Sequence, residues 1–201
     1  MHPNPVFRSK TAARDLAFAR DLGFGLLIAD GPMVAHVPFL LADDGNTADL
    51  HLLRSNPIAR AVAQGDVPAV IAVQGPQGYI SPDWYEVADQ VPTWNYVAVH
   101  LRGRLMALTD DALPDLLDRQ SDHFEATLDP KPRWTTDKMT PEVYARMRRS
   151  IVPARLTIET VDATWKLSQN KPDAVRLRAA DGVQAQGAAD LADLMRTPPE
   201  L

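Results

Sequence analysis

Short apolar stretches, broken by Gly, Pro and Asp, dominate the first half of the chain. Residues 24–30 and 33–41 are too short for helices and are divided by a Gly-Pro pair, which predicts a β-hairpin. A short strand follows at 49–53. Residues 67–75 are β-branched and almost wholly apolar, which is typical of a strand covered on both faces. A separate short extended segment is expected at 79–85.

The clearest alternation of side chains runs through residues 93–108, which predict one long strand. Trp94 and Tyr96 fall on one face of this strand, and Asn95 falls on the other. A later segment, residues 154–165, also alternates with a period of two and predicts a strand that returns to the same sheet.

Helical spacing of apolar residues, together with helix-end residues, predicts the helical segments. Asn56 as an N-cap and Gly23 as a left-handed C-terminal residue are the clearest end signals. The segments are 9–22, 57–65, 110–128, 141–151 and a tail around 191–195. Strands, then two helices, then a returning strand predict a mainly β (α+β) fold, a closed or nearly closed antiparallel barrel with helices packed outside.

Composition narrows the class of protein. With 201 residues and no Cys, the chain can bury a core without disulfides, and thiolate catalysis and Cys-based zinc sites are excluded. No apolar run reaches membrane-spanning length, and the start lacks the apolar segment of a signal peptide, so we expect a cytoplasmic protein without membrane contact. DNA stays open as a partner, but a net charge of -5 does not support it.

Aromatic residues are crowded into the segment 75–100, which holds Tyr79, Trp84, Tyr85, Trp94 and Tyr96. Together with hydroxyl and amide side chains, such a group suits a flat, partly polar ligand. The alternative is an aromatic mini-core under a long loop, and composition alone favours this alternative slightly.

Two polar clusters could bind an anion. Residues 53–57, LRSNP, join the end of a strand to the start of a helix and offer a guanidinium, a hydroxyl and backbone donors to a phosphate. The alternative is a plain Asn-Pro helix start with Arg54 in solvent. Residues 166–170, KLSQN, offer an ammonium and two amides directly after a strand. Alternatively, Ser168 and Asn170 cap a helix that begins near Pro172.

Other chemistry lacks its motif. The histidines at 36, 51, 100 and 123 show no metal-ligand spacing and no HExxH, so no metal site is predicted. The chain also has no GxSxG elbow, no Walker sequence and no GxGxxG turn. These absences argue against a serine hydrolase, a P-loop NTPase and a Rossmann dehydrogenase.

A series of unusual motifs in a fixed order resembles the PaiB family of FMN-binding proteins, which are named as negative transcriptional regulators. The motifs are HPNPVF, AHVPFLL, HLLRSNP, QGPQGYISPDWY, VPTWNYVAVHLRG and WKLSQNKP, and the resemblance covers about residues 1 to 185. It departs from the family pattern in the tail after Lys171. At residues 53–57 the family would have Ala-Arg-Ala-Asn-Pro, and the present LRSNP keeps the Arg and Asn and adds a hydroxyl.

The resemblance implies an antiparallel split β-barrel like that of flavin reductases and pyridoxamine-phosphate oxidases, as a single domain over 1–201 with a helical insertion at about 110–150 and a helical C-terminal tail. It also implies a homodimer with FMN in clefts between two barrels. The residues expected to bind FMN are His36, Val37, Pro38, Arg54, Ser55, Asn56, Thr93, Trp94, Asn95, Tyr96, Lys166, Gln169 and Asn170. Residues 36–38 would face the isoalloxazine and 54–56 the phosphate.

Three functions stay open at this point. The preferred one is an FMN-binding homodimer of the PaiB regulator type. The second is a flavin-dependent oxidoreductase, either an FMN reductase or an oxidase of a small molecule, that does not bind DNA directly. The third is a flavin-free dimeric scaffold that acts through protein contacts alone. Nothing in the sequence names a catalytic residue or a substrate.

Overall fold

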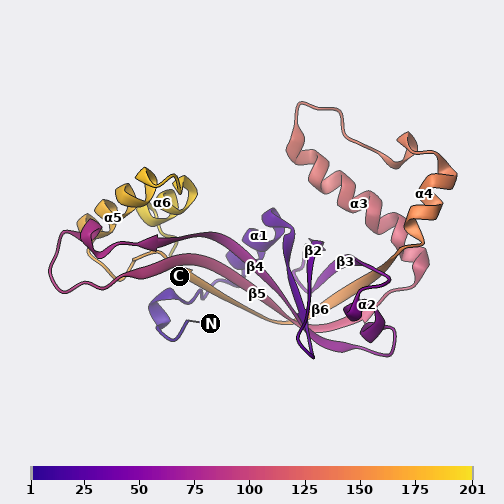
Figure 1. Ribbon diagram of the computed structural model, residues 1–201, viewed down its shortest axis with the longest axis horizontal. Coiled ribbons are helices and arrows are strands. Elements are labelled where there is room, and N and C mark those ends of the chain that lie inside the picture. Colours follow the sequence, from indigo (N-terminus) through magenta and orange to yellow (C-terminus); the bar gives the residue numbers. More distant parts are fainter. Residues whose placement is uncertain (1, 201) are drawn as a thin grey trace. The chain divides into compact units, whose positions relative to one another are not determined.

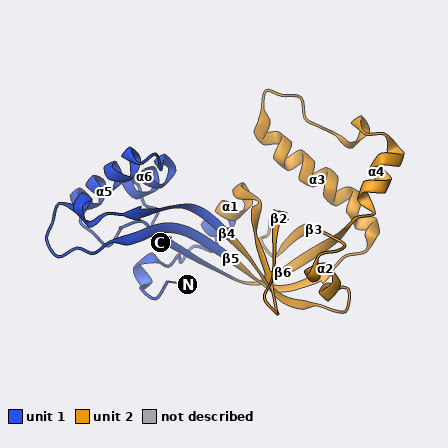
Figure 2. Cartoon of the chain, viewed as in Figure 1, with its two compact units in different colours: residues 1–17, 73–100, 161–201 blue, residues 18–72, 101–160 orange. Residues whose placement is uncertain are grey.

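The structure is a computed structural model that describes residues 2–200. The chain forms two compact units, and several strands run from one into the other (Figure 2). Unit 1 comprises residues 1–17, 73–100 and 161–201, and unit 2 comprises residues 18–72 and 101–160.

Six strands form a closed barrel in the order β1-β2-β3-β6-β5-β4 (Figure 1). The strands are β1 (Phe24–Ala29), β2 (Met33–Leu41), β3 (Thr47–Leu53), β4 (Val67–Ile80), β5 (Thr93–Ala107) and β6 (Ile151–Lys166). The helices are α1 (Ala12–Leu22), α2 (Pro57–Val62), α3 (Leu113–Glu125), α4 (Pro141–Arg148), α5 (Asp173–Ala185) and α6 (Ala189–Arg196). The predicted antiparallel barrel with helices is confirmed. None of the helices in residues 2–200 has both the length and the apolar run that crossing a membrane needs.

The barrel of unit 2 is filled by every second side chain of its strands, as a period-two pattern requires. All six strands contribute large, fully buried side chains there: Leu27, Phe39, Leu50, Ile71, Leu101, Leu105 and Leu156. The hairpin is confirmed, with Leu27 of β1 opposite Ala35 of β2. The long strand at 93–108 is also confirmed as β5, in which Asn95, Val97, Val99 and Leu101 face inward.

Helix ends follow the sequence signals. Gly23 has a φ of +56° directly after α1, as expected of a left-handed C-terminal residue. Asn56 accepts a hydrogen bond from the Ile58 N–H at 2.8 Å and so caps α2. Both predictions are confirmed.

Strand β4 differs from the prediction. The segments 67–75 and 79–85 are not separate strands, because β4 continues to Ile80 and only then gives way to a 3-10 helix, Pro82–Tyr85. Strand β4 pairs with β1 only over Ala69–Ala72, so Pro76 costs no hydrogen bond of that ladder. Within a single chain, the expected cover on both faces of 67–75 is not found, since alternate residues of β4 stay partly exposed.

Unit 1 contains α5 and α6 together with parts of β4, β5 and β6. Helix α5 contacts α6 and the 3-10 helix Pro82–Tyr85 (Figure 1). At Gly182 of α5, a Cβ would lie 2.5 Å from the Trp84 ring, so only Gly allows this approach. Tyr85 is fully buried. The mini-core interpretation therefore describes Trp84 and Tyr85, but not Tyr79, which stays exposed.

Strands β5 and β6 of unit 2 approach each other closely at Gly103. A Cβ at this position would lie 1.8 Å from the carbonyl oxygen of Thr157 and 2.9 Å from its carbonyl carbon. Since both atoms belong to the backbone, no side-chain rotation relieves the overlap.

We expect Gly103→Ala to lower the free energy of unfolding by about 3 kcal/mol or more, because it forces two backbones apart. Urea denaturation followed by circular dichroism measures the change. Gly78→Ala is the matched control, since its Cβ would meet only the flexible end of Leu191 at 3.0 Å. Equal stability of the two variants would contradict this account of Gly103.

Candidate functional site

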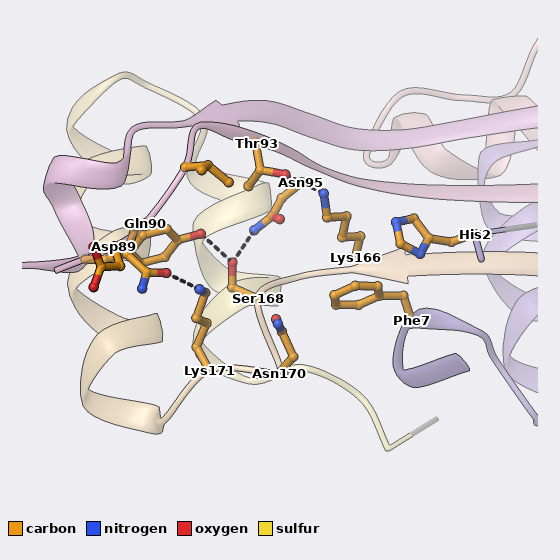
Figure 3. A pocket seen from close by; sticks show the side chains of 12 residues that line it. His2, Phe7, Asp89, Gln90, Thr93, Asn95, Lys166, Ser168, Asn170 and Lys171 are labelled. Atoms are coloured by element: carbon orange, nitrogen blue, oxygen red, sulfur yellow. Dashed lines mark hydrogen bonds between the residues drawn. The ribbon is translucent and has the colours of Figure 1, made fainter. Parts of the chain in front are cut away.

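A cavity of about 400 Å³ lies in unit 1, where motifs distant in the sequence converge (Figure 3). Its volume is within the range of small-molecule sites. We call it the unit 1 pocket. It is lined by His2, Phe7, Tyr85, Asp89, Gln90, Val91, Thr93, Asn95, Lys166, Ser168, Asn170 and Lys171. Four of the predicted cofactor residues are among them: Thr93, Asn95, Lys166 and Asn170.

Strand β5 contributes to the pocket through alternate residues. Thr93 and Asn95 line it, whereas Trp94 and Tyr96 do not. Trp94 is half exposed, and its indole N–H donates to Gln77 Oε1 at 2.7 Å. Its ring meets Tyr79 edge-on at 6.3 Å. The structure therefore divides the predicted TWNY group between two faces of one strand.

Ser168 ties the walls of the pocket together. Asn95 Nδ2 donates to its hydroxyl oxygen at 2.9 Å, and the Tyr85 hydroxyl lies 3.2 Å from the same oxygen (Figure 3). Ser168 is buried and has a φ of +63°, an uncommon conformation for a residue with a side chain. It does not cap α5, whose N-cap is Pro172 without a side-chain bond, so the capping interpretation of Ser168 is wrong.

The side chain of Asn95 leaves one buried polar atom without a hydrogen-bond partner. The residue is fully buried, its amide N–H₂ is used by Ser168, and its Oδ1 has no hydrogen-bond partner. A buried acceptor left without a partner costs about 1–3 kcal/mol. Such a group at the wall of a cavity fits a ligand that brings an N–H or O–H donor.

Two lysines add positive charge. Lys166 Nζ donates to Thr93 Oγ1, and Lys171 Nζ donates to Gln90 Oε1 (Figure 3). Lys171 Nζ also lies 4.8 Å from the centre of the Tyr85 ring. Burial lowers the pKa of Lys166 below its ordinary value, because the charged form loses hydration.

Other residues of the KLSQN motif have different roles. Gln169 Oε1 accepts from the Leu167 N–H at 2.8 Å, while its Nε2 donates to the carbonyls of Trp165 and Val6. Gln169 therefore holds the loop and the N-terminal segment in place and is not among the residues that line the pocket. Asn170 does line it.

Several pocket residues were not predicted from the sequence. His2 and Phe7 belong to the N-terminal HPNPVF motif, which was noted only as part of the resemblance. Asn4 caps the 3-10 helix Pro5–Phe7 by accepting from the Val6 N–H, which turns Phe7 inward. That Asn-Pro start was a usable signal for order in this segment. Lys171 directly follows KLSQN, so the anion-binding argument made for Lys166 could have included it.

The remaining predicted residues lie in unit 2. His36 is exposed on the outer face of β2, and its ring stacks on Phe24 at 6.4 Å with 22° between the planes. Val37 points into the barrel and is almost fully buried. Pro38 is partly exposed, and its carbonyl accepts from Gln120 Nε2 at 3.2 Å. Of these three, His36 offers the most accessible surface to a ring.

Arg54 already has partners. Its guanidinium donates to the carbonyls of Arg149 and Ile151 and lies 3.2 Å from the Asp110 carboxylate. Asn56 Oδ1 is used as the cap of α2, and the Ser55 carbonyl accepts from Arg60. A phosphate role for residues 54–56 stays a prediction, and any phosphate there would share Arg54 with a carboxylate.

Among residues 2–200, no group of three or more His, Asp or Glu side chains is arranged to hold a metal ion. Within the same range, the unit 1 pocket combines two ammonium groups with one buried acceptor that has no partner.

Comparison with known proteins gives a consistent picture. Residues 1–160 match the model of a family described as "Putative FMN-binding domain". The chain is 32% identical over 170 residues to "Protease synthase and sporulation protein PAI 2" of Bacillus subtilis, covering 82% of this chain and 80% of that protein. This match confirms the predicted resemblance to the PaiB family.

Solved structures share the fold at low sequence identity. The flavocytochrome Anf3 of Azotobacter vinelandii has a TM-score of 0.58 at 14% identity, over 82% of this chain and 72% of that one. A FAD and heme binding protein of Mycobacterium smegmatis has a TM-score of 0.55 at 18% identity, over 79% and 73%. Together with the closed barrel, these likenesses confirm the split-barrel fold.

The residues present fit FMN. The ribityl chain of FMN carries hydroxyl donors that Asn95 Oδ1 could accept from, and the adjoining phosphate suits Lys166 and Lys171. In unit 2, the stacked rings of His36 and Phe24 offer an apolar surface to a flat ring.

We expect Ser168→Ala to lower the free energy of unfolding by about 1–3 kcal/mol, because the buried polar groups of Asn95 and Tyr85 both lose their partner. Thermal and urea denaturation measure the loss. Ser150→Ala is the control, since Ser150 is exposed and bonds only locally to the Met147 carbonyl. If both variants unfold like the parent chain, Ser168 does not hold the pocket.

Proposed function

Since the chain belongs to the FMN-binding family whose model matches residues 1–160, with FMN as its cofactor, we propose that it is a homodimer of the PaiB regulator type. In this proposal the flavin lies in clefts formed where two barrels pair. When bound, FMN would supply one-electron and two-electron redox chemistry. The chain's own residues bind the flavin, orient it and shield it from water.

The outer face of the sheet β2-β1-β4 supports the dimer. Pairing across the strands places Phe24 opposite Pro38, Leu26 opposite His36 and Ala72, and Ile28 opposite Val34 and Val70, and directly paired residues share a face. These side chains are partly to half exposed. A continuous apolar sheet face of this kind is typical of a protein interface.

The coincidence of this face with a predicted flavin residue is the observation that carries the proposal. His36 stacks on Phe24 within the face, so a flat ring bound there would lie where the second barrel packs. One surface would then serve both the cofactor and the partner, as a flavin cleft between two barrels requires.

The regulatory role is supported by similarity to the Bacillus subtilis protein, whose name refers to protease synthesis and sporulation. The net charge of -5 favours regulation without extensive contact to DNA phosphates. Direct DNA binding would give a mobility shift that weakens steeply with salt. No shift at low salt would direct the proposal toward regulation through the flavin or through a protein partner.

The proposal predicts that the chain binds flavin. The purified chain should either be yellow or change the visible spectrum of added FMN, with saturation at one flavin per chain. An absorbance titration measures this binding. Colourless protein that leaves the FMN spectrum unchanged would remove the flavin from the proposal. Anaerobic mixing with NADH or NADPH is the second step, and bleaching of the flavin band would favour the oxidoreductase alternative.

The proposal also predicts that a charge on the apolar face of β2-β1-β4 disrupts the dimer. Phe24→Glu places a charge on the apolar face and should convert the dimer to a monomer, because a buried carboxylate without a partner is costly. Size-exclusion chromatography with light scattering measures the mass. Met147→Glu is the matched control, since Met147 is a 58% exposed side chain of α4 that is not on this face. A parent chain that is monomeric at every concentration would refute the homodimer.

A further inference from the structure

Unlike several other basic residues of the chain, the lysines of the unit 1 pocket are not matched by acids among the described residues. Elsewhere in residues 2–200 cations are commonly matched by acids, as Arg155 and Arg119 are matched by Asp49. Lys166 and Lys171 donate only to the neutral oxygens of Thr93 and Gln90 and form no ion pair within the described residues.

This charge is held in a partly closed place. Phe7 is buried beside the pocket, and its ring centre lies 6.0 Å from Lys166 Nζ. The N-terminal segment is fixed to β6 by the His2 N–H, which donates to Thr164 Oγ1, and Arg8 Nε donates to the His2 carbonyl at 2.6 Å. Charges that are screened less by water interact more strongly with a ligand.

The uncharged polar groups narrow the ligand further. Asn95 lines the pocket, and its buried Oδ1 lacks a donor, so a ligand that fills the site should present an N–H or O–H to it. Asp89 also lines the pocket and would disfavour a ligand with negative charge spread over its whole surface. These groups suit a ligand that has one compact anionic group and, elsewhere in the molecule, one hydrogen-bond donor.

We propose that the unit 1 pocket binds an oxyanion, a phosphate monoester or a carboxylate, between Lys166 and Lys171, and that Asn95 Oδ1 accepts a hydrogen bond from a donor on the same molecule. Two sources have this chemistry. One is the phosphate end of FMN, in which case the inference rests on the proposed function. The other is a separate small anionic molecule that binds whether or not flavin is present.

The test compares FMN with riboflavin, which lacks the phosphate, on three variants of the full chain. These are the double variant Lys166→Met with Lys171→Met, the single variant Arg54→Ala, and the control Lys10→Met. Lys10 is exposed and lines none of the described pockets. Its substitution removes a positive charge outside the unit 1 pocket. Titration by fluorescence gives the dissociation constants, and inorganic phosphate is titrated separately by thermal shift.

If the pocket holds the phosphate of FMN, the double variant loses about tenfold or more in FMN affinity while its riboflavin affinity is unchanged. If a separate anion binds there, FMN affinity falls only in Arg54→Ala, and the double variant loses the thermal shift caused by inorganic phosphate. The phosphate measurement uses flavin-free protein, so it still reports when FMN does not bind. The proposal is overturned if the double variant matches Lys10→Met in both titrations.

A second measurement needs no variant. Acetylation of the parent chain by a soluble ester, read by mass spectrometry, should be slowed at Lys166 and Lys171 by FMN or by millimolar inorganic phosphate, and unchanged at Lys10. Equal labelling of all three lysines with and without these probes would also overturn the proposal.

The affinity for either anion should fall as the pH rises, and at a lower pH than for an ordinary lysine, because burial lowers the pKa of Lys166.

Discussion

The unit 1 pocket depends on one buried hydroxyl. Ser168 Oγ meets Asn95 of β5 and Tyr85 of the 3-10 helix, so three separate segments share a single hydrogen-bonding centre. Its left-handed backbone follows the last residue of β6 closely and turns the chain toward α5. The same bond uses the amide N–H₂ of Asn95 and leaves its oxygen free. The interaction that orders the pocket thus also leaves one buried acceptor without a partner.

Much of the barrel could be predicted from the sequence because its rules are local. Alternation identified β5, and the Asn56 cap and the glycine after α1 fixed helix ends. The length of β4 could not be predicted in this way. Strand β4 can continue past Pro76 because its pairing with β1 has already ended at Ala72, so no β1 carbonyl needs the missing N–H of the proline. A proline is read locally as a break, but its cost depends on a neighbouring strand.

The candidate site shows the same limit more sharply. Alternation correctly separated Asn95 from Trp94 and Tyr96, yet it could not tell which face of the strand borders a cavity. The KLSQN motif was a good guide to Lys166 and Asn170, but Gln169 is used to hold the backbone. Arg54 looked free in the sequence, whereas its carboxylate partner, Asp110, comes from a segment that follows β5. The sequence shows which hydrogen-bonding groups a side chain has, but often not which distant residue they bind.

Under the proposed function, flavin binding and dimer formation cannot be independent. The ring pair of Phe24 and His36 belongs to the apolar face that would meet the second barrel, so a flavin bound there would touch both subunits. A ligand that binds the dimer more tightly than the monomer stabilises the dimer by the same factor, because the coupling is reciprocal. The apolar face would be covered most completely when flavin is bound, and loss of flavin would weaken the assembly. In such a protein the cofactor controls which surfaces are available to a partner, and this control needs no basic face and no catalytic residue.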